Sequence, residues 1–433
     1  MSTTYPLPAA GEPTLIGAAP AQRVSSKYAW LVFLLTFGLM LSDFMSRQVL
    51  NAVFPILKQS WSLSDTQLGS LNSIVALMVG LLALPLSIVS DSWGHRRAIL
   101  AMAVLWSLAT LWCGLAHSYH EMLVARFFVG VGEAAFGSVG VAILLRVFPE
   151  KLRATVVAAF MSGGVLGTVV GMALGGVLAS RLGWRWAFLA MAIFGLVLAG
   201  LYYLFVTEGR IAGKQGHAPA KERLSLAVVL RHILGRRTLW FAYSGGAFQM
   251  FILASLAAWL PSYLNRVYAF PIAKAAAISA VFLLLSAAGT TVCGNISDRL
   301  SVRVAQRKWM LAISFAAFSS AALFWAFRLP PGSAQLAVLA VGVLVVTGSY
   351  GPIGAVIGRL VPGSTHASAY GLMNVVNNLL GIAIGPFLTG VLADAIGLGG
   401  ALQWVPVVGF LSVSLLYVGS RLYAEDVRRH DQA

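Results

Sequence analysis

The fold of this chain is indicated by a short polar stretch, SDSWGHRRAIL at residues 90–100, which separates two long apolar segments. An acid stands at the end of the first segment, and a basic cluster follows directly after it. The second half of the chain repeats this arrangement in GNISDRLSVRVAQRKWM, residues 294–310. Such an internal repeat predicts a chain that is built of two related halves.

The composition indicates that the surrounding medium is lipid. Of the 433 residues, 59% are hydrophobic and only 10% are charged, which leaves too few polar side chains to coat a soluble globule. A helix needs about 20 apolar residues to cross a bilayer. Twelve segments meet this need, at residues 30–52, 67–89, 98–116, 121–147, 154–180, 185–206, 238–264, 274–295, 309–327, 334–358, 369–393 and 400–422. We therefore expect an all-α integral membrane protein with twelve transmembrane helices.

The predicted helices fall into two groups of six. The longest hydrophilic interruption, residues 207–237, divides them and is interpreted as a cytoplasmic linker. We expect pseudo-symmetric six-helix halves at residues 28–206 and 238–422, arranged around a central cavity. Residues 1–27 are rich in proline and lack the basic start of a secretion signal, so they predict a disordered cytoplasmic tail. Residues 423–433 are expected to form a cytoplasmic C-terminal tail.

The net charge of +16 is interpreted as a topology signal. With twelve helices, the loops on one side carry most of the Lys and Arg residues, including a cluster from Arg210 to Arg237. By the positive-inside rule, both termini are cytoplasmic and the chain is a multi-pass protein of the cytoplasmic (inner) membrane. Attraction to anionic lipid headgroups is a secondary effect. We expect no nucleic-acid partner, because no basic patch interleaved with aromatic residues remains.

The sequence does not predict an enzyme. Cys113 and Cys293 lie in separate apolar segments and are interpreted as small core residues. Glycines are frequent in residues 163–176, but no Lys-Ser or Lys-Thr pair follows them to form a nucleotide loop. With no metal-ligand spacing and no ATP-binding segment, we expect no metal and no cofactor, and energy that comes from an ion gradient.

Four charged residues stand inside apolar segments, namely Asp43, Arg47, Arg126 and Glu133. A charge in hydrocarbon costs roughly 2.5 to 3.5 kcal/mol, so it usually lines a water-filled path or a proton relay. Asp43 and Arg47 share a helix face at i, i+4. Arg126 and Glu133 share another face, but at about 10 Å apart along the axis they need a third helix to pair. The alternative interpretation is a structural charge network that fixes helix packing.

The polar stretch at residues 90–100 resembles the loop signature between helices 2 and 3 of the major facilitator superfamily. The matching positions are Asp91, Gly94, Arg96 and Arg97, and the related place in the second half holds Asp298 and Arg299. The resemblance implies a gating loop, in which loop charges and helix ends hold one closed state together. The alternative is that these charges only enforce topology.

The segment RFFVGVGEAAFGSVG, residues 126–140, resembles helix 4 of the spinster-like transporters and of the anion:cation symporters. Both families usually carry an Asp directly before the Arg of helix 1, where this chain has Ser46. Asp43 lies one turn earlier, and whether it takes over the role of that acid stays open. The resemblance covers residues 28–422 and implies a major facilitator fold.

The second half carries neutral polar residues in place of embedded charges. Such groups need partners within a membrane, so they either bond neighbouring helices or contact substrate. The candidates for substrate binding are Tyr243, Gln249, Tyr350, Asn374 and Asn378.

Together these features predict a secondary active transporter that moves a small organic anion, a carboxylate, by proton-coupled symport and alternating access. Glu133 is the first candidate for the proton carrier and Asp43 the second, because a carboxyl group that changes its environment can bind and release a proton. Arg47 and Arg126 are candidates for binding either the substrate carboxylate or Glu133 itself.

Two alternatives stay open, an exporter of lysolipids or other amphiphilic compounds and drugs, and a non-transporting membrane receptor. The expected partners are the anion, protons and membrane lipid, and the expected state is a monomer. Import is favoured over export, whereas the substrate itself stays open.

Overall fold

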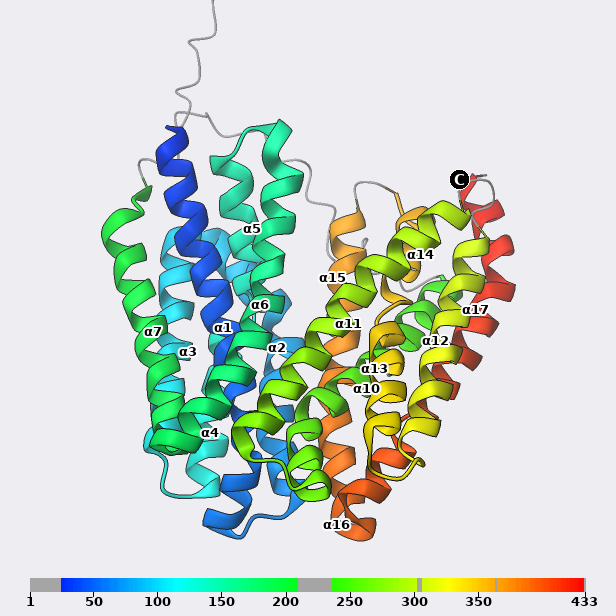
Figure 1. Ribbon diagram of the computed structural model, residues 1–433. Coiled ribbons are helices and arrows are strands. Elements are labelled where there is room, and N and C mark those ends of the chain that lie inside the picture. Colours follow the sequence, from blue (N-terminus) through cyan, green and yellow to red (C-terminus); the bar gives the residue numbers. More distant parts are fainter. Residues whose placement is uncertain (1–24, 209–235, 302–305, 363–364, 432–433) are drawn as a thin grey trace, which may run out of the picture.

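Helices account for every regular element of the computed structural model, which describes residues 25–208, 236–301, 306–362 and 365–431 (Figure 1). The predicted all-α class is confirmed in these ranges. Nearly all of the predicted N-terminal tail and of the central linker lies outside the described residues, as do the last two residues of the C-terminal tail.

The helices of the first half occupy residues 26–205. Their bounds are α1 Ser26–Trp61, α2 Asp65–Trp93, α3 His95–Leu115, α4 Tyr119–Glu133, α5 Phe136–Val147, α6 Glu150–Leu182 and α7 Trp184–Phe205. The helices of the second half are α10 Arg237–Tyr268, α11 Ile272–Ser301, α12 Arg307–Ala326, α13 Ser333–Val346, α14 Tyr350–Leu360, α15 His366–Val376, the π-helical turn η2 Asn377–Ile382, α16 Ile384–Trp404 and α17 Val407–Asp431.

The number of membrane spans agrees with the sequence. Among the described residues, eleven helical segments are long and apolar enough to cross a membrane, and a shorter apolar helix, Val407–Tyr423, follows them. The last span begins later than predicted, at Val407 in place of residue 400. The chain stays helical to Trp404 apart from Gly397, which has φ 77°, and Pro406 precedes the start of α17. Proline suits a helix start, because it has no backbone N–H to leave unpaired.

Both halves interrupt their fourth span. In the first half the span Tyr119–Val147 breaks between α4 and α5, directly after Glu133. In the second half the span Ser333–Leu360 breaks between α13 and α14, at residues 347–349. Broken helices at equivalent places in two repeats are typical of transport proteins, where they border the binding site. These breaks were not predicted from the sequence.

The two halves lie side by side, with α1–α7 on one side and α10–α17 on the other (Figure 1). The start of α1 and the C-terminal end of α17 lie at the same end of the molecule. Close contacts between the halves join α2 to α16, α6 to α11 and α1 to α10. Gly69 permits one of them, since a Cβ at this position would lie 2.5 Å from the carbonyl oxygen of Pro386. In another, the rings of Phe54 and Trp259 pack with centroids 5.3 Å apart.

Candidate functional site

The embedded charges of α1 and α4 form one buried cluster. Arg47 Nε lies 2.6 Å from Glu133 Oε2 and 3.5 Å from Asp43 Oδ1. Asp43 and Arg47 meet because they stand one helical turn apart on α1. Glu133 reaches Arg47 from the last residue of α4, and both acids are only 3% exposed. One guanidinium therefore serves two carboxyl groups, which makes its position sensitive to the charge on either of them.

Arg126 is buried beside this cluster but forms no ion pair within the described part of the chain. Its Nε donates to the carbonyl oxygen of Leu71 at 3.2 Å, and its Nη1 donates to that of Ser46 at 3.1 Å. The side chain is 1% exposed, and its Nη2 has no hydrogen-bond partner among the described residues. Arg126 thus ties α4 to α1 and α2 while one of its donor groups stays available.

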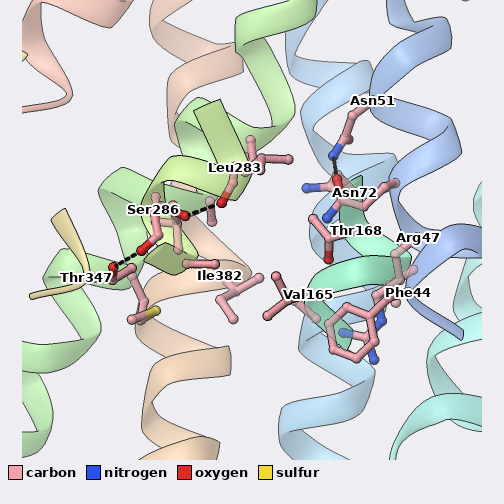
Figure 2. A pocket seen from close by; sticks show the side chains of 18 of the residues that line it. Phe44, Arg47, Asn51, Asn72, Val165, Thr168, Leu283, Ser286, Thr347 and Ile382 are labelled. Atoms are coloured by element: carbon pink, nitrogen blue, oxygen red, sulfur yellow. Dashed lines mark hydrogen bonds between the residues drawn. The ribbon is translucent and has the colours of Figure 1, made fainter. Parts of the chain in front are cut away.

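A cavity of about 300 Å³ lies between the two halves, and Figure 2 shows Arg47 at its wall. Arg126 also lines this cavity. Most of the polar residues in its lining come from the first half: Arg47, Gln48, Asn51, Asn72, Arg126 and Thr168. The lining from the second half is mainly apolar and includes Leu253, Ala257, Leu283 and Ile382. Neither Asp43 nor Glu133 belongs to this lining. Arg47 therefore stands between the cavity and the two buried acids.

The five polar candidates of the second half lie outside the lining of this cavity. Tyr243 donates its hydroxyl to the carbonyl oxygen of Ala369 at 3.1 Å, which joins α10 to α15. Gln249 accepts a hydrogen bond from Ser319 at 3.4 Å. Both bonds join neighbouring helices, which is the alternative to substrate contact that the sequence left open.

The other three candidates lie on α14, α15 and η2. Asn378 donates to the backbone oxygen of Asn374 at 2.9 Å and to its side-chain oxygen at 3.2 Å, where α15 continues into η2. Tyr350 begins α14 and is 36% exposed. In this conformation the second half contributes different polar residues to the cavity, namely Ser286, Thr290 and Thr347.

Sequence reasoning missed the polar residues that flank the arginines. Asn51 follows Arg47 by one helical turn, and its amide donates to Gln48 Oε1 at 2.8 Å. Asn72 faces the same cavity from α2. The i, i+4 spacing of Arg47 and Asn51 is a signal that could have found the first of them.

The predicted gating-loop residues of the first half make contacts within that half. Gly94 connects α2 to α3 with φ 90°, a conformation that suits glycine. Asp91 lies 3.6 Å from His95, and Arg97 lies 4.0 Å from Glu208. Arg96 donates to the carbonyl oxygens of Val206 and Tyr203, the latter at 2.9 Å. These contacts attach the loop to the end of α7.

The corresponding residues of the second half behave similarly. Asp298 accepts from Lys308 at 2.9 Å, between the end of α11 and the start of α12. Arg299 is exposed at the end of α11.

The opposite end of the molecule holds a charge cluster that joins the two halves, and we call Lys58, Asp65, Arg266 and Asp394 the inter-half clamp. Arg266 of α10 donates two hydrogen bonds to Asp65 of α2, at 2.7 and 2.8 Å. Lys58 of α1 donates to the same carboxylate at 2.7 Å. Asp65 is only 2% exposed, whereas the Arg266 side chain is 26% exposed, so the carboxylate is shielded from water and its partner is in part solvated. A bidentate pair of this kind is both strong and directional.

Asp394 completes the clamp from α16. Its two carboxylate oxygens accept from the backbone N–H groups of Asp65 and Thr66, at 2.7 and 2.9 Å. These are the first N–H groups of α2, which have no partner within their own helix. An acid at a helix N-terminus is favourable. The start of α2 is itself fixed by a capping box between Ser64 and Gln67.

Two helical halves, broken spans at equivalent positions and buried charges at a cavity between the halves define a membrane transporter of the alternating-access class. The chain belongs to the Major Facilitator Superfamily, whose sequence model matches residues 32–386. It is therefore a multi-pass membrane transporter and not an enzyme.

Two relatives and one solved structure illustrate the relationship. The chain is 27% identical to a hexuronate transporter of Bacillus subtilis (strain 168), over 85% of this chain and 88% of the relative. It is 26% identical to a gallate transporter of Pseudomonas putida, over 64% and 67%. Its fold is similar to that of a bacterial homologue of the human lysosomal transporter Spinster in an inward-facing, unoccupied conformation. The TM-score is 0.83 at 21% identity, over 93% of this chain and 99% of the other.

Proposed function

We propose that this protein is a proton-coupled symporter of a small organic anion with a carboxylate group. The observation that carries the proposal is Arg126, a buried guanidinium that lines the cavity with one N–H group lacking a described partner. Such a group favours an anionic ligand, because a guanidinium fork matches a carboxylate in shape and charge. The hexuronate and gallate transporters among the relatives support an anionic substrate.

Competition for Arg47 is the proposed coupling step. Without substrate, Arg47 is held by Glu133 and Asp43 on the buried side. A carboxylate that enters the cavity draws Arg47 away from Glu133. A buried acid that loses its counter-charge is more stable when neutral, so Glu133 then takes up a proton. Substrate and proton are thus bound together and released together.

The inter-half clamp is proposed as the gate of the outer side. The positive-inside rule assigns both termini and the gating loops to the cytoplasm, and the clamp lies at the opposite end. In this structure the clamp is closed. The described contacts of Arg96, Arg97 and Asp298 at the other end stay within one half. We assign this arrangement to the inward-facing state, from which the clamp must open to admit substrate from outside.

Proteoliposomes with an imposed pH gradient test this function. Radiolabelled galacturonate and benzoate are supplied outside, and accumulation is measured against protein-free liposomes. Glu133→Gln, which keeps the shape of the side chain but cannot titrate, should abolish accumulation while exchange of preloaded substrate continues. Equal loss of accumulation and exchange would show that Glu133 has a structural role and not a coupling role.

An exporter of amphiphilic compounds is the second candidate, and the apolar lining from the second half favours it. The same liposomes separate the possibilities. An amphiphile exporter would ignore small carboxylates, and a receptor without transport activity would show no flux of any compound.

A further inference from the structure

The two walls of the cavity differ in chemistry. In Figure 2 Arg47, Asn51 and Asn72 lie on one side, and Leu283, Ser286 and Thr347 lie on the other. The first wall presents guanidinium and amide groups beside a smaller number of apolar side chains. Most of the second wall is hydrocarbon, contributed by Leu253, Ala257 and Leu283 among others. A ligand that spans the cavity must therefore be polar at one end only.

The hydroxyl groups of the second wall use their own hydrogens within the wall, so toward a ligand they can accept a hydrogen bond but cannot donate one. Ser286 donates to the carbonyl oxygen of Leu283 at 2.8 Å, and Thr347 donates to that of Ser286 at 2.8 Å. The Thr290 hydroxyl lies 2.7 Å from that of Thr347 and 3.0 Å from the carbonyl oxygen of Ser286, and its single hydrogen goes to one of these two acceptors. None of the three hydroxyls has a spare hydrogen for a ligand oxygen in this arrangement.

Polar groups that are free to bind are concentrated at the arginine wall. Arg126 Nη2 and Asn51 Oδ1 are both buried and without a described hydrogen-bond partner. Their residues are each 1% exposed, and both line the cavity. One carboxylate satisfies the guanidinium, and one neighbouring hydroxyl can donate to Asn51 Oδ1, an acceptor that a carboxylate cannot satisfy. The further hydroxyls of a sugar acid would be left against the hydrocarbon of the second wall. A hydroxyl that is buried without a partner is costly.

We infer that, within the proposed anion transport on which this inference rests, the substrate is a carboxylate with a compact apolar ring or chain, and not a polyhydroxylated sugar acid. The carboxylate binds Arg126 and Arg47, and the apolar body packs against Leu253, Ala257 and Leu283. The size of the cavity, about 300 Å³, is at the lower end of the usual range for small-molecule pockets and agrees with a small ligand.

Calorimetric titration of the purified full-length protein in detergent tests the inference with a matched pair of ligands. Cyclohexanecarboxylate and galacturonate both carry a carboxylate on a six-membered ring, and they differ in the ring oxygen and hydroxyls. The first should bind at least roughly tenfold more tightly, because its ring leaves no hydroxyl unpaired. The neutral cyclohexanecarboxamide should bind more weakly than the carboxylate.

The outcomes separate the two levels of the proposal. Equal or tighter binding of galacturonate would overturn the apolar-body inference but leave anion transport standing. Absence of binding by both acids, or equal binding of the carboxamide, would overturn the proposed function and the inference with it.

Two neighbouring leucines of α11 provide a matched pair of variants. Leu283 lines the cavity, whereas Leu284 is 47% exposed on the outer surface of the helix. Leu283→Ala should weaken cyclohexanecarboxylate binding roughly fivefold, since it removes apolar contact area. Leu284→Ala should leave the affinity unchanged. No change in Leu283→Ala, or an equal loss in both variants, would show that the ligand body does not contact this wall.

Discussion

At the scale of single residues, Arg126 combines two tasks that a lysine cannot perform together. Its Nε and Nη1 hold the backbone oxygens of Leu71 and Ser46, and its Nη2 is available to the cavity. Arg126→Lys replaces this fork with a point charge, so we expect carboxylate affinity to fall roughly tenfold or more. Calorimetry on the variant measures this loss. Arg328→Lys, at an exposed position, is the control, and unchanged affinity in Arg126→Lys would remove Arg126 from the substrate site.

The sequence predicted the embedded charges because charge in an apolar segment is conspicuous whatever the fold. It also predicted that Asp43 and Arg47 meet, since their spacing lies within one helix. It could not predict that Arg47 pairs with Glu133, because that contact depends on how α1 packs against α4. Neutral residues such as Asn72 and Tyr243 gave weaker signals, since an amide or a phenol can bond either a helix or a ligand.

At the scale of elements, the inter-half clamp should hold the outer end of α2 against α10 and α16. Arg266→Gln removes both hydrogen bonds to Asp65 and leaves that buried carboxylate with Lys58 alone. We therefore expect the outer end to open more often. A cysteine placed at Asn51, with Cys113 and Cys293 replaced, should react several-fold faster with a membrane-impermeant thiol reagent added outside.

The control for the clamp is Arg181→Gln, which removes an exposed charge from the end of α6. This variant should leave the labelling rate unchanged. Equal labelling of the Arg266 variant and the parent protein would mean that the clamp does not keep the outer end closed.

Most elements could be predicted from the sequence, because each span carries its own apolar signal and the polar breaks mark the loops. The interruptions of the fourth spans were not predicted, although Glu133 adjoins the first of them, and Thr347, Gly348 and Ser349 form a small and polar stretch at the second. Their location is set by tertiary packing around the cavity. The start of α17 was placed too early, because the segment near residue 400 is apolar throughout.

At the scale of the whole molecule, the repeat and the charge bias were sufficient to predict two halves in a membrane. The conformational state could not be predicted from the sequence. It depends on contacts such as that of Asp65 with Arg266, which are 201 residues apart. Alternating access requires such contacts to form at one end and to break at the other, while the charges in the centre exchange partners.

The central claim is that an anion in the cavity frees Glu133 from Arg47 and so makes it bind a proton. Proton uptake on ligand binding tests this claim directly. It can be measured with a pH indicator in weakly buffered detergent solution near neutral pH, using the tightest-binding carboxylate of the calorimetric series. We expect about one proton to be taken up for each anion bound by the parent protein and none by Glu133→Gln. Anion binding without proton uptake in the parent protein, or equal uptake in the variant, would contradict the account.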